Sequence, residues 1–236
     1  MKALFASFAY NEGTKIRDTL ARVPGDREYD FLVMDDGSSD GSLDDLDAGK
    51  FILLRNDANR GIGASIRRVI GYAREHGYEV LGIMAGNNKD EPEEIPKLLA
   101  PIANDEADVV QGSRYLPGGV AGNTPAHRRF ATRWVHPVLF SVFARQRMTD
   151  TTNGFRAIRL SIFDDQRIDL DQPWLEKYEL EPYILFKAIR LGYRVAEVPV
   201  SKIYPPKELG YTKMRPVTGW WSILRPIFLL GLGFKK

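Results

Sequence analysis

The chain has 236 residues, of which 44% are hydrophobic and 27% are charged, which is ordinary for a globular protein. Its 33 lysines and arginines nearly balance 31 aspartates and glutamates, so the formal net charge of +2 gives no reason to expect a nucleic acid partner. The sequence contains no cysteine, which excludes disulfide bonds and thiolate metal sites.

Strand and helix patterns alternate through the first half of the chain. Short apolar runs predict strands at residues 3–8, 29–34, 51–54, 80–84 and 107–111. Helical patterns lie between them at 14–23, 62–76 and 92–103. This alternation is typical of βαβ units, and it predicts an α/β fold with a mostly parallel sheet and helices on both faces.

The second half departs from this alternation. Residues 116–126 are rich in Gly and Pro and are expected to form a long loop. A helix with a wide apolar face is expected at 126–145, with a kink at Pro137. A further helix at 178–191 precedes a strand at 194–200.

The C-terminal segment 217–236 is unusually apolar and aromatic. It contains Trp220 and Trp221, but Arg225 interrupts it, so it is a poor candidate for a membrane-spanning helix. These features indicate a segment that lies at a membrane surface, with a terminal helix docked on the core as the alternative. We therefore expect one domain at 1–216 followed by an interfacial segment.

The first residues contain too short an apolar run for a signal peptide. Together with the apolar C-terminal segment, this predicts a cytoplasmic protein that is peripheral at the inner face of the membrane.

Four polar segments stand at the ends of predicted strands or at the start of a predicted helix. They are Ala9–Glu12, Asp35–Ser42, Asn59–Ala64 and Gly112–Tyr115. In a doubly wound sheet they lie near the carboxyl edge, where ligands bind. The two aspartates of the second segment can accept hydrogen bonds from a base or ribose, or hold a cation that binds a diphosphate. Alone, each segment also fits an ordinary turn or helix start.

Six segments occur together in a characteristic order: AYNE, MDDGSSDGS, NRGIGAS, GSRYLPGG, TDTTNGFRAI and GYRVAEVPV. The set resembles the family 2 glycosyltransferases, and most closely their dolichyl-phosphate mannosyltransferase-like branch. The resemblance extends from about residue 3 to residue 211. It implies a GT-A (Rossmann-like) fold and a nucleotide-diphosphate sugar as donor. It also implies a polyprenyl phosphate acceptor at the cytosolic face of a membrane.

The resemblance assigns nucleotide binding to residues that follow the first three strands. The matching positions are Tyr10, Asn11, Glu12, Asp35, Asp36, Arg60 and Gly61. A carboxylate at Asp36 can accept a hydrogen bond from a uracil or guanine N–H. The glycines after Arg60 let the backbone come close to the ligand.

The resemblance assigns catalysis and acceptor binding to Arg114, Arg128 and Asp150. The two arginines match residues that hold the acceptor phosphate, for which a planar guanidinium is well suited. A phosphate is already ionised at neutral pH, so Asp150 is expected to orient the sugar or the arginines. Lys213 matches a basic residue that closes over the diphosphate. The alternatives are an exposed helix face for Arg128, a helix cap for Asp150 and a solvated loop for Lys213.

One element of the family pattern is missing. Members carry Asp-x-Asp after the fourth strand to hold a divalent cation, whereas the matching positions here are Ala85 and Asn87, and Lys89 replaces a usual Gln. In the first of three hypotheses, Asn87 and Asp90, with Asp36 as a further ligand, hold Mg2+ or Mn2+ weakly. In the second, Lys89 neutralises the diphosphate without a metal. In the third, the chain binds a nucleotide sugar without turning it over.

The sequence therefore predicts a glycosyltransferase that moves a hexose from a UDP- or GDP-sugar to a polyprenyl-phosphate-type lipid. One alternative is the same donor with a saccharide acceptor, for which Asp150 would serve as general base. The other is a catalytically silent protein that binds nucleotide sugars. The expected partners are the donor, the lipid phosphate and a membrane surface, and a separate membrane protein is a further candidate.

Overall fold

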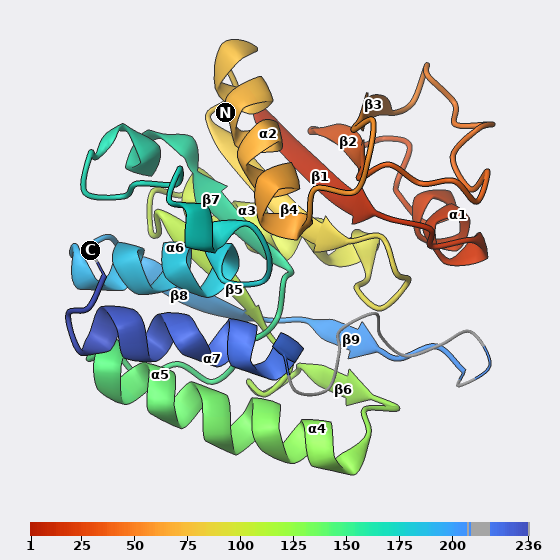
Figure 1. The fold of residues 1–236 in the computed structure, drawn as a ribbon. Coiled ribbons are helices and arrows are strands. Elements are labelled where there is room, and N and C mark those ends of the chain that lie inside the picture. Colours follow the sequence, from red (N-terminus) through yellow and green to blue (C-terminus); the bar gives the residue numbers. More distant parts are fainter. Residues whose placement is uncertain (207, 209–217, 236) are drawn as a thin grey trace.

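The computed structural model describes residues 1–206, 208 and 218–235 (Figure 1). Its centre is a seven-stranded sheet in the order β3-β2-β1-β4-β7-β5-β8. Its strands are β1 (Ala3–Ala9), β2 (Asp30–Asp35), β3 (Ile52–Arg55), β4 (Val80–Ala85), β5 (Val109–Ser113), β7 (Arg156–Arg159) and β8 (Val195–Pro199). Neighbouring strands are parallel except around β7, which is antiparallel to β4 and β5. The predicted α/β fold with a mostly parallel sheet is confirmed.

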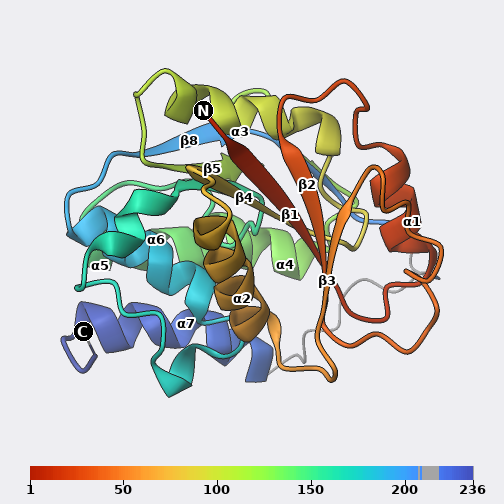
Figure 2. The same cartoon turned by 90° about the horizontal axis from the view of Figure 1, so that it is seen from above.

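Helices cover both faces of the sheet (Figure 2). They are α1 (Thr14–Ala21), α2 (Ile62–Glu75), α3 (Ile95–Ala103), α4 (Ala126–Phe130), α5 (His136–Ala144), α6 (Leu180–Arg190) and α7 (Thr218–Gly231). Side chains alternate along β1, so Leu4, Ala6 and Phe8 join the core formed with α2, α5 and α6. Ala3 and Phe5 join the opposite core, with α1 and α3. Burial on both faces explains the continuous apolar character of β1.

The strand β7 is absent from the sequence prediction. It has four residues, two of them arginines, so neither its length nor its pattern distinguishes it from a loop. Arg156 is 2% exposed, and its guanidinium donates to the carbonyl oxygens of Glu181 (3.0 Å) and Asn153 (2.8 Å). A buried arginine is therefore tolerated in the centre of the sheet because backbone acceptors surround it.

A second, two-stranded sheet lies beside the carboxyl end of β5 and β8. It pairs β6 (Val120–Gly122) with β9 (Ser201–Ile203) in parallel. The first of these strands falls within residues 116–126, where the sequence predicted only a loop. Three residues in a Gly-rich stretch give no strand pattern, and the pairing with β9 is a long-range contact that composition does not reveal.

The helix expected at 126–145 changes type along its length. A π-helical turn at Ala131–Val135 separates α4 from α5. Pro137 lies in the first turn of α5, directly after the π-helical turn, and its nitrogen has no hydrogen to donate to the preceding turn. The predicted kink therefore takes the form of a wider turn immediately before the proline.

The C-terminal helix α7 packs against α5 and α6. Ile227 is fully buried, and the Arg225 guanidinium lies 2.7 Å from the Glu179 carboxylate. The inner face of α7 is therefore docked on the core, which corresponds to the alternative that the sequence left open. Trp221 remains 55% exposed, so a membrane-surface role for the segment stays a prediction. Within the described ranges, no helix is both long and apolar enough to cross a membrane.

His136 joins α5 to α7 and to the loop before β7. It is 1% exposed, its Nε2 lies 3.1 Å from the Ile223 carbonyl oxygen, and its Nδ1 lies 2.6 Å from Thr151 Oγ1. A carbonyl oxygen can only accept, so Nε2 carries the proton and Nδ1 accepts from the threonine hydroxyl. Burial lowers the pKa of His136 to about 4, which keeps the ring neutral.

We therefore expect the stability of the protein to fall as the pH falls from about 6.5 to about 4. In this window the unfolded chain binds a proton at His136 and the folded chain does not, which costs about 2 kcal/mol between pH 7 and pH 5. Urea unfolding at several pH values measures the slope. His136→Gln should flatten it, whereas His127→Gln, at an exposed histidine, should not. Equal slopes in both variants would contradict this role of His136.

Candidate active site

Two aspartates stand at the carboxyl end of β2, and one of them contacts the backbone at the start of α2. Asp36 is buried, and its carboxylate accepts hydrogen bonds from the backbone N–H groups of Arg60 and Gly61, both at 2.9 Å. Asp35 is fully buried and lies 2.7 Å from Arg55 Nε. The structure thus brings Asp35, Asp36, Arg60 and Gly61 together as predicted, through contacts within the chain itself.

The loop after β1 runs along the same edge of the sheet. Asn11 Oδ1 accepts a hydrogen bond from the Ser39 N–H (2.7 Å), which ties this loop to the one after β2. Tyr10 is 37% exposed beside it, and Glu12 pairs with Lys15 at 2.8 Å. The predicted nucleotide-binding residues therefore share one rim of the sheet, and their role in binding a nucleotide stays a prediction.

The glycines at the start of α2 make room for another part of the chain. A Cβ atom on Gly63 would lie 2.1 Å from the Leu175 carbonyl oxygen, and one on Gly61 would lie 2.7 Å from that of Glu176. The Gly63 N–H donates to the Glu176 carbonyl oxygen at 3.0 Å. The sequence analysis expected these glycines to let a ligand come close to the backbone. In the structure the backbone of residues 175–176 occupies that space, which a side chain on either glycine would fill.

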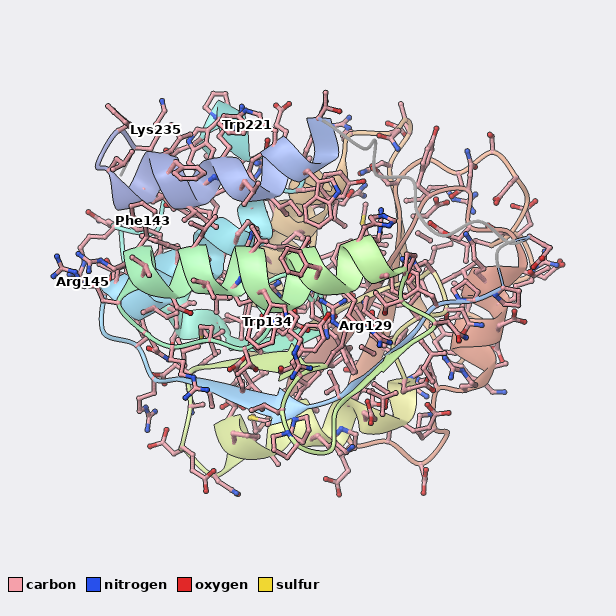
Figure 3. The ribbon with its side chains drawn as sticks, turned by 90° about the horizontal axis from the view of Figure 1, so that it is seen from below. Arg129, Trp134, Phe143, Arg145, Trp221 and Lys235 are labelled. Atoms are coloured by element: carbon pink, nitrogen blue, oxygen red, sulfur yellow. The ribbon has the colours of Figure 1, made fainter. Side chains whose placement is uncertain are left out.

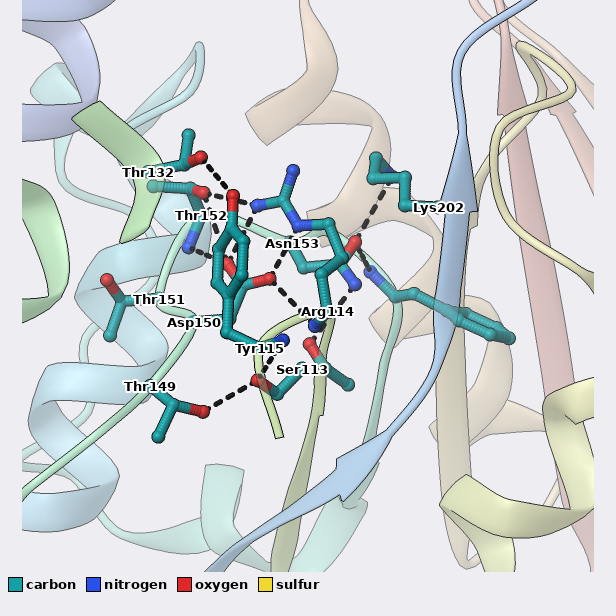
Figure 4. A network of polar contacts seen from close by, with 12 residues as sticks. Ser113, Arg114, Tyr115, Thr132, Thr149, Asp150, Thr151, Thr152, Asn153 and Lys202 are labelled. Carbon is teal, nitrogen blue, oxygen red and sulfur yellow. Dashed lines mark hydrogen bonds and ion pairs between the residues drawn. The ribbon is translucent and has the colours of Figure 1, made fainter. Parts of the chain in front are cut away.

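A buried ion pair lies at the carboxyl end of β5 (Figure 4). The Arg114 guanidinium contacts both carboxylate oxygens of Asp150, from Nε at 2.6 Å and from Nη2 at 2.8 Å. Arg114 is 4% exposed and Asp150 is fully buried. Burial alone raises the pKa of Asp150, but the charge and hydrogen bonds of Arg114 outweigh it and hold the pKa below its ordinary value. Asp150 is therefore ionised, and both of its carboxylate oxygens are bound to Arg114.

Glu197 on β8 fixes the loop that carries Asp150. Its carboxylate accepts hydrogen bonds from the backbone N–H groups of Thr149 (2.8 Å) and Asp150 (2.9 Å) and from the Thr149 hydroxyl (2.9 Å). Burial raises the pKa of Glu197. On the far side, Thr152 Oγ1 accepts from Arg114 Nη2 at 2.7 Å. The position of the ion pair is thus set by contacts from the neighbouring strand β8 and from the loop itself.

A second buried pair lies next to the first. Lys202 Nζ on β9 lies 2.5 Å from Asp90 Oδ1 and 3.1 Å from Asn153 Oδ1. Lys202 is 8% exposed and Asp90 is fully buried. Since Asn153 belongs to the same loop as Asp150, the segment after β4 and the loop before β7 meet at this lysine.

Two further cations surround Tyr204, just past β9. Lys89 Nζ lies 4.5 Å from the centre of the Tyr204 ring, and Arg128 Nη1 lies 3.5 Å from its hydroxyl. Burial, followed by repulsion from Lys202, lowers the pKa of Lys89 to about 7. Arg128 acts in the same direction, whereas Asp90 and Glu12 oppose the shift. Three cations, Lys89, Lys202 and Arg128, thus form one cationic group near Tyr204.

The predicted metal ligands do not form a recognisable metal site. The carboxylate of Asp90 faces Lys202, and the Asp-x-Asp positions hold a methyl group at Ala85 and a neutral amide at Asn87. No cluster of three or more His, Asp or Glu side chains suited to a metal occurs in the part of the chain that the structure describes. Mg2+ and Mn2+ prefer charged oxygen ligands, and two lysines at the same place oppose a cation. The donor set does not fit a divalent metal.

The structure places most of the predicted site residues along one edge and gathers Arg114, Asp150, Arg128, Lys89 and Asp90 near Tyr204 and Asn153. Lys213 lies outside the described residues. The sequence prediction missed Lys202, Tyr204, Asn153 and Glu197 as site residues. Lys202 and Tyr204 follow the predicted strand at 194–200, just as Arg114 follows the predicted strand at 107–111. Their position after a strand was therefore the feature of the sequence that could have identified them as site residues.

The chain is similar in sequence to known proteins over most of its length. Residues 8–167 match the profile of glycosyl transferase family 2. The undecaprenyl-phosphate mannosyltransferase of Micrococcus luteus is 33% identical over 223 residues, covering 91% of this chain and 88% of that protein. The polyprenol monophosphomannose synthase of Mycolicibacterium smegmatis is 30% identical over 213 residues, covering 87% of this chain and 78% of that protein.

A solved structure extends the similarity to the fold. Glucosyl-3-phosphoglycerate synthase of Mycobacterium tuberculosis, in complex with Mn2+, UDP and phosphoglyceric acid, matches with a TM-score of 0.67 at 15% identity. The match covers 96% of this chain and 78% of that one. Fold and sequence together show that this chain belongs to glycosyl transferase family 2, in its dolichyl-phosphate mannosyltransferase-like branch, and is a nucleotide-sugar glycosyltransferase.

Proposed function

We propose that the enzyme transfers a hexose from a UDP- or GDP-sugar to a polyprenyl phosphate at a membrane surface. The observation that carries this proposal is the helical segment from α4 to α5, which has a cation facing the site and apolar side chains facing outwards. Relatives that act on undecaprenyl phosphate and polyprenol, as their names state, support the same acceptor class.

The inner side of this segment supplies positive charge for a phosphate. Arg128 reaches the Tyr204 hydroxyl beside Lys89 and Lys202. Arg114 is already bound to Asp150 on both carboxylate oxygens, so we infer that Arg128 meets the acceptor phosphate and that Arg114 positions the loop behind it. Of the two arginines that the sequence proposed for the phosphate, the structure thus favours Arg128.

The outer side carries a stripe of exposed apolar residues (Figure 3). Phe130, Trp134, Val138 and Val142 follow one another at intervals of four residues and are 54–68% exposed. Exposed arginines flank the stripe at positions 129, 133 and 145, and Trp221 is exposed on α7, the helix that packs against α5. An apolar stripe with basic borders suits the interface of an anionic lipid bilayer, into which aromatic side chains insert.

The two sides together match the shape of the acceptor. A polyprenyl phosphate has a long apolar chain that stays in the membrane and an anionic head that must reach the sugar. In the reaction, an oxygen of the acceptor phosphate bonds to the anomeric carbon while the bond from that carbon to the nucleoside diphosphate breaks. The leaving diphosphate takes the bonding electrons, and the neighbouring cations stabilise its charge. Since the attacking phosphate is already ionised, Asp150 need not accept a proton.

The proposal is tested by turnover of the purified full chain with radiolabelled UDP- and GDP-hexoses. We expect label to pass into an organic-soluble product when a polyprenyl phosphate in detergent is supplied, and not when it is omitted. Transfer to a soluble saccharide instead would replace the acceptor in the proposal. Donor binding without any transfer would make the chain a nucleotide-sugar binding protein.

The membrane face makes a second prediction. Val142→Asp, at the most exposed position of the stripe, should weaken sedimentation of the protein with vesicles that contain anionic phospholipid, because a carboxylate disfavours insertion and repels the anionic surface. Leu53→Asp is the matched control, since Leu53 is 38% exposed on β3 at the opposite edge of the sheet. Equal binding by both variants would remove the stripe from the proposal.

The Arg114–Asp150 pair makes a third prediction. Asp150→Asn keeps the side-chain shape but leaves the buried Arg114 charge without its partner, so unfolding should require about 3 kcal/mol less free energy. The control is Asp164→Asn, which breaks an exposed pair with Arg74 and should cost less than about 1 kcal/mol. Urea unfolding of both variants measures the difference. Similar losses would mean that the buried pair does not organise the site.

A further inference from the structure

Compared with the family pattern, the segment after β4 has fewer negative charges and an additional positive charge. Where the family pattern has two carboxylates, the chain has Ala85 and Asn87, and Lys89 follows them. Asp90 is the nearest carboxylate along this segment, and it lies 2.5 Å from Lys202 Nζ. The negative charge that could attract a metal ion is therefore already matched by an ammonium group of the chain itself.

Among the residues that the structure describes, the charges around Tyr204 do not balance. With Lys89 protonated, the cationic group contributes three positive charges, and the carboxylates of Asp90 and Glu12 oppose them. Glu12 also lies 2.8 Å from Lys15, so these six side chains carry four positive and two negative charges. Lys89 is 5% exposed and Lys202 is 8% exposed, so water screens this excess poorly. A buried excess of positive charge at the ligand edge of the sheet is what an anion with more than one charge would neutralise.

The geometry favours a diphosphate as that anion. Lys202 is held from two sides, by Asp90 and by Asn153 Oδ1 at 3.1 Å, so its ammonium group is fixed in place. Lys89 packs over the Tyr204 ring, and Arg128 approaches the hydroxyl of the same ring. The cations therefore come from three separate segments, after β4, on β9 and on α4, and they converge beside the loop that carries Asp150.

We propose that Lys89 and Lys202 take the place of the divalent metal ion, so that this transferase binds the diphosphate of its donor, and releases it, without metal. In this arrangement Asp90 holds Lys202 and does not ligate a cation. The ammonium groups donate hydrogen bonds to the diphosphate oxygens and stabilise the charge that develops when the bond to the sugar breaks. This inference rests on the proposed function, because it assumes a nucleoside diphosphate in the site.

Calorimetric titration of the full chain with UDP and with GDP tests the inference directly. Each titration is made once in EDTA and once in Mn2+, and the corresponding nucleosides, uridine and guanosine, are titrated as controls. We expect one of the diphosphates to bind in EDTA with an affinity within about threefold of that in Mn2+, and far more tightly than its nucleoside. Binding that requires Mn2+ would overturn the inference and leave the proposed function intact.

Variants then test the lysines. Lys89→Met keeps the length of the side chain without its charge, and we expect it to weaken diphosphate binding in EDTA by at least about tenfold while nucleoside binding is unchanged. Lys50→Met, at a lysine that is 70% exposed, is the control for loss of one charge and should bind as the wild type does.

A double variant guards against misfolding. Asp90→Asn combined with Lys202→Met removes both partners of the buried pair, so no buried charge is left unpaired, and it should weaken diphosphate binding in the same way. Wild-type affinity in both the single and the double variant would overturn the role of the lysines. If the wild type binds neither diphosphate in EDTA or in Mn2+, the proposed function and this inference both fail.

Discussion

The site depends on the ion pair between Arg114 and Asp150. A guanidinium and a carboxylate that are both almost completely buried hold each other in place, because neither has water available as a substitute partner. The pair connects the end of β5 to the loop that precedes β7, and Glu197 on β8 fixes that loop from the other side. Three segments that are distant in sequence are thereby locked at one edge of the sheet.

The same loop also contacts one lysine of the cationic group. Asn153 contacts Lys202, which in turn contacts Asp90 after β4, so the position of Lys202 depends on the loop that the ion pair orders. Tyr115, next to Arg114, places its hydroxyl 2.6 Å from Thr132 in the π-helical turn between α4 and α5. Arg114 at the edge of the sheet and the helical segment with the exposed apolar stripe are thus connected through adjacent residues that follow β5.

The sequence predicted the fold well where the pattern is local. Parallel strands buried on both faces leave continuous apolar runs, and the run that became β1 could be recognised without knowledge of its neighbours. The strand β7 could not, because its place in the sheet depends on pairing with β4 and β5 and on backbone acceptors for Arg156. Residues that follow strands, such as Asp36 and Arg114, were found by the rule that ligands bind at the carboxyl edge. Their actual partners were not predicted, since Asp36 accepts hydrogen bonds from the start of α2 and Arg114 contacts both carboxylate oxygens of Asp150.

A site whose positive charge comes from lysine side chains differs from one whose charge comes from a bound metal ion. A metal ion brings its charge together with the ligand, and the empty site then carries carboxylates that remain solvated. Lysines belong to the chain, so their charge does not leave with the ligand. Burial and repulsion from Lys202 lower the pKa of Lys89 to about 7, which reflects the strain of holding two ammonium groups close together and leaves Lys89 partly neutral at neutral pH. That strain is unfavourable for the folded chain without ligand and is relieved when an anion enters. A site built in this way stores part of the binding energy for its anion in the repulsion between its own side chains, and it depends on a rigid surrounding loop, without which the lysines would separate.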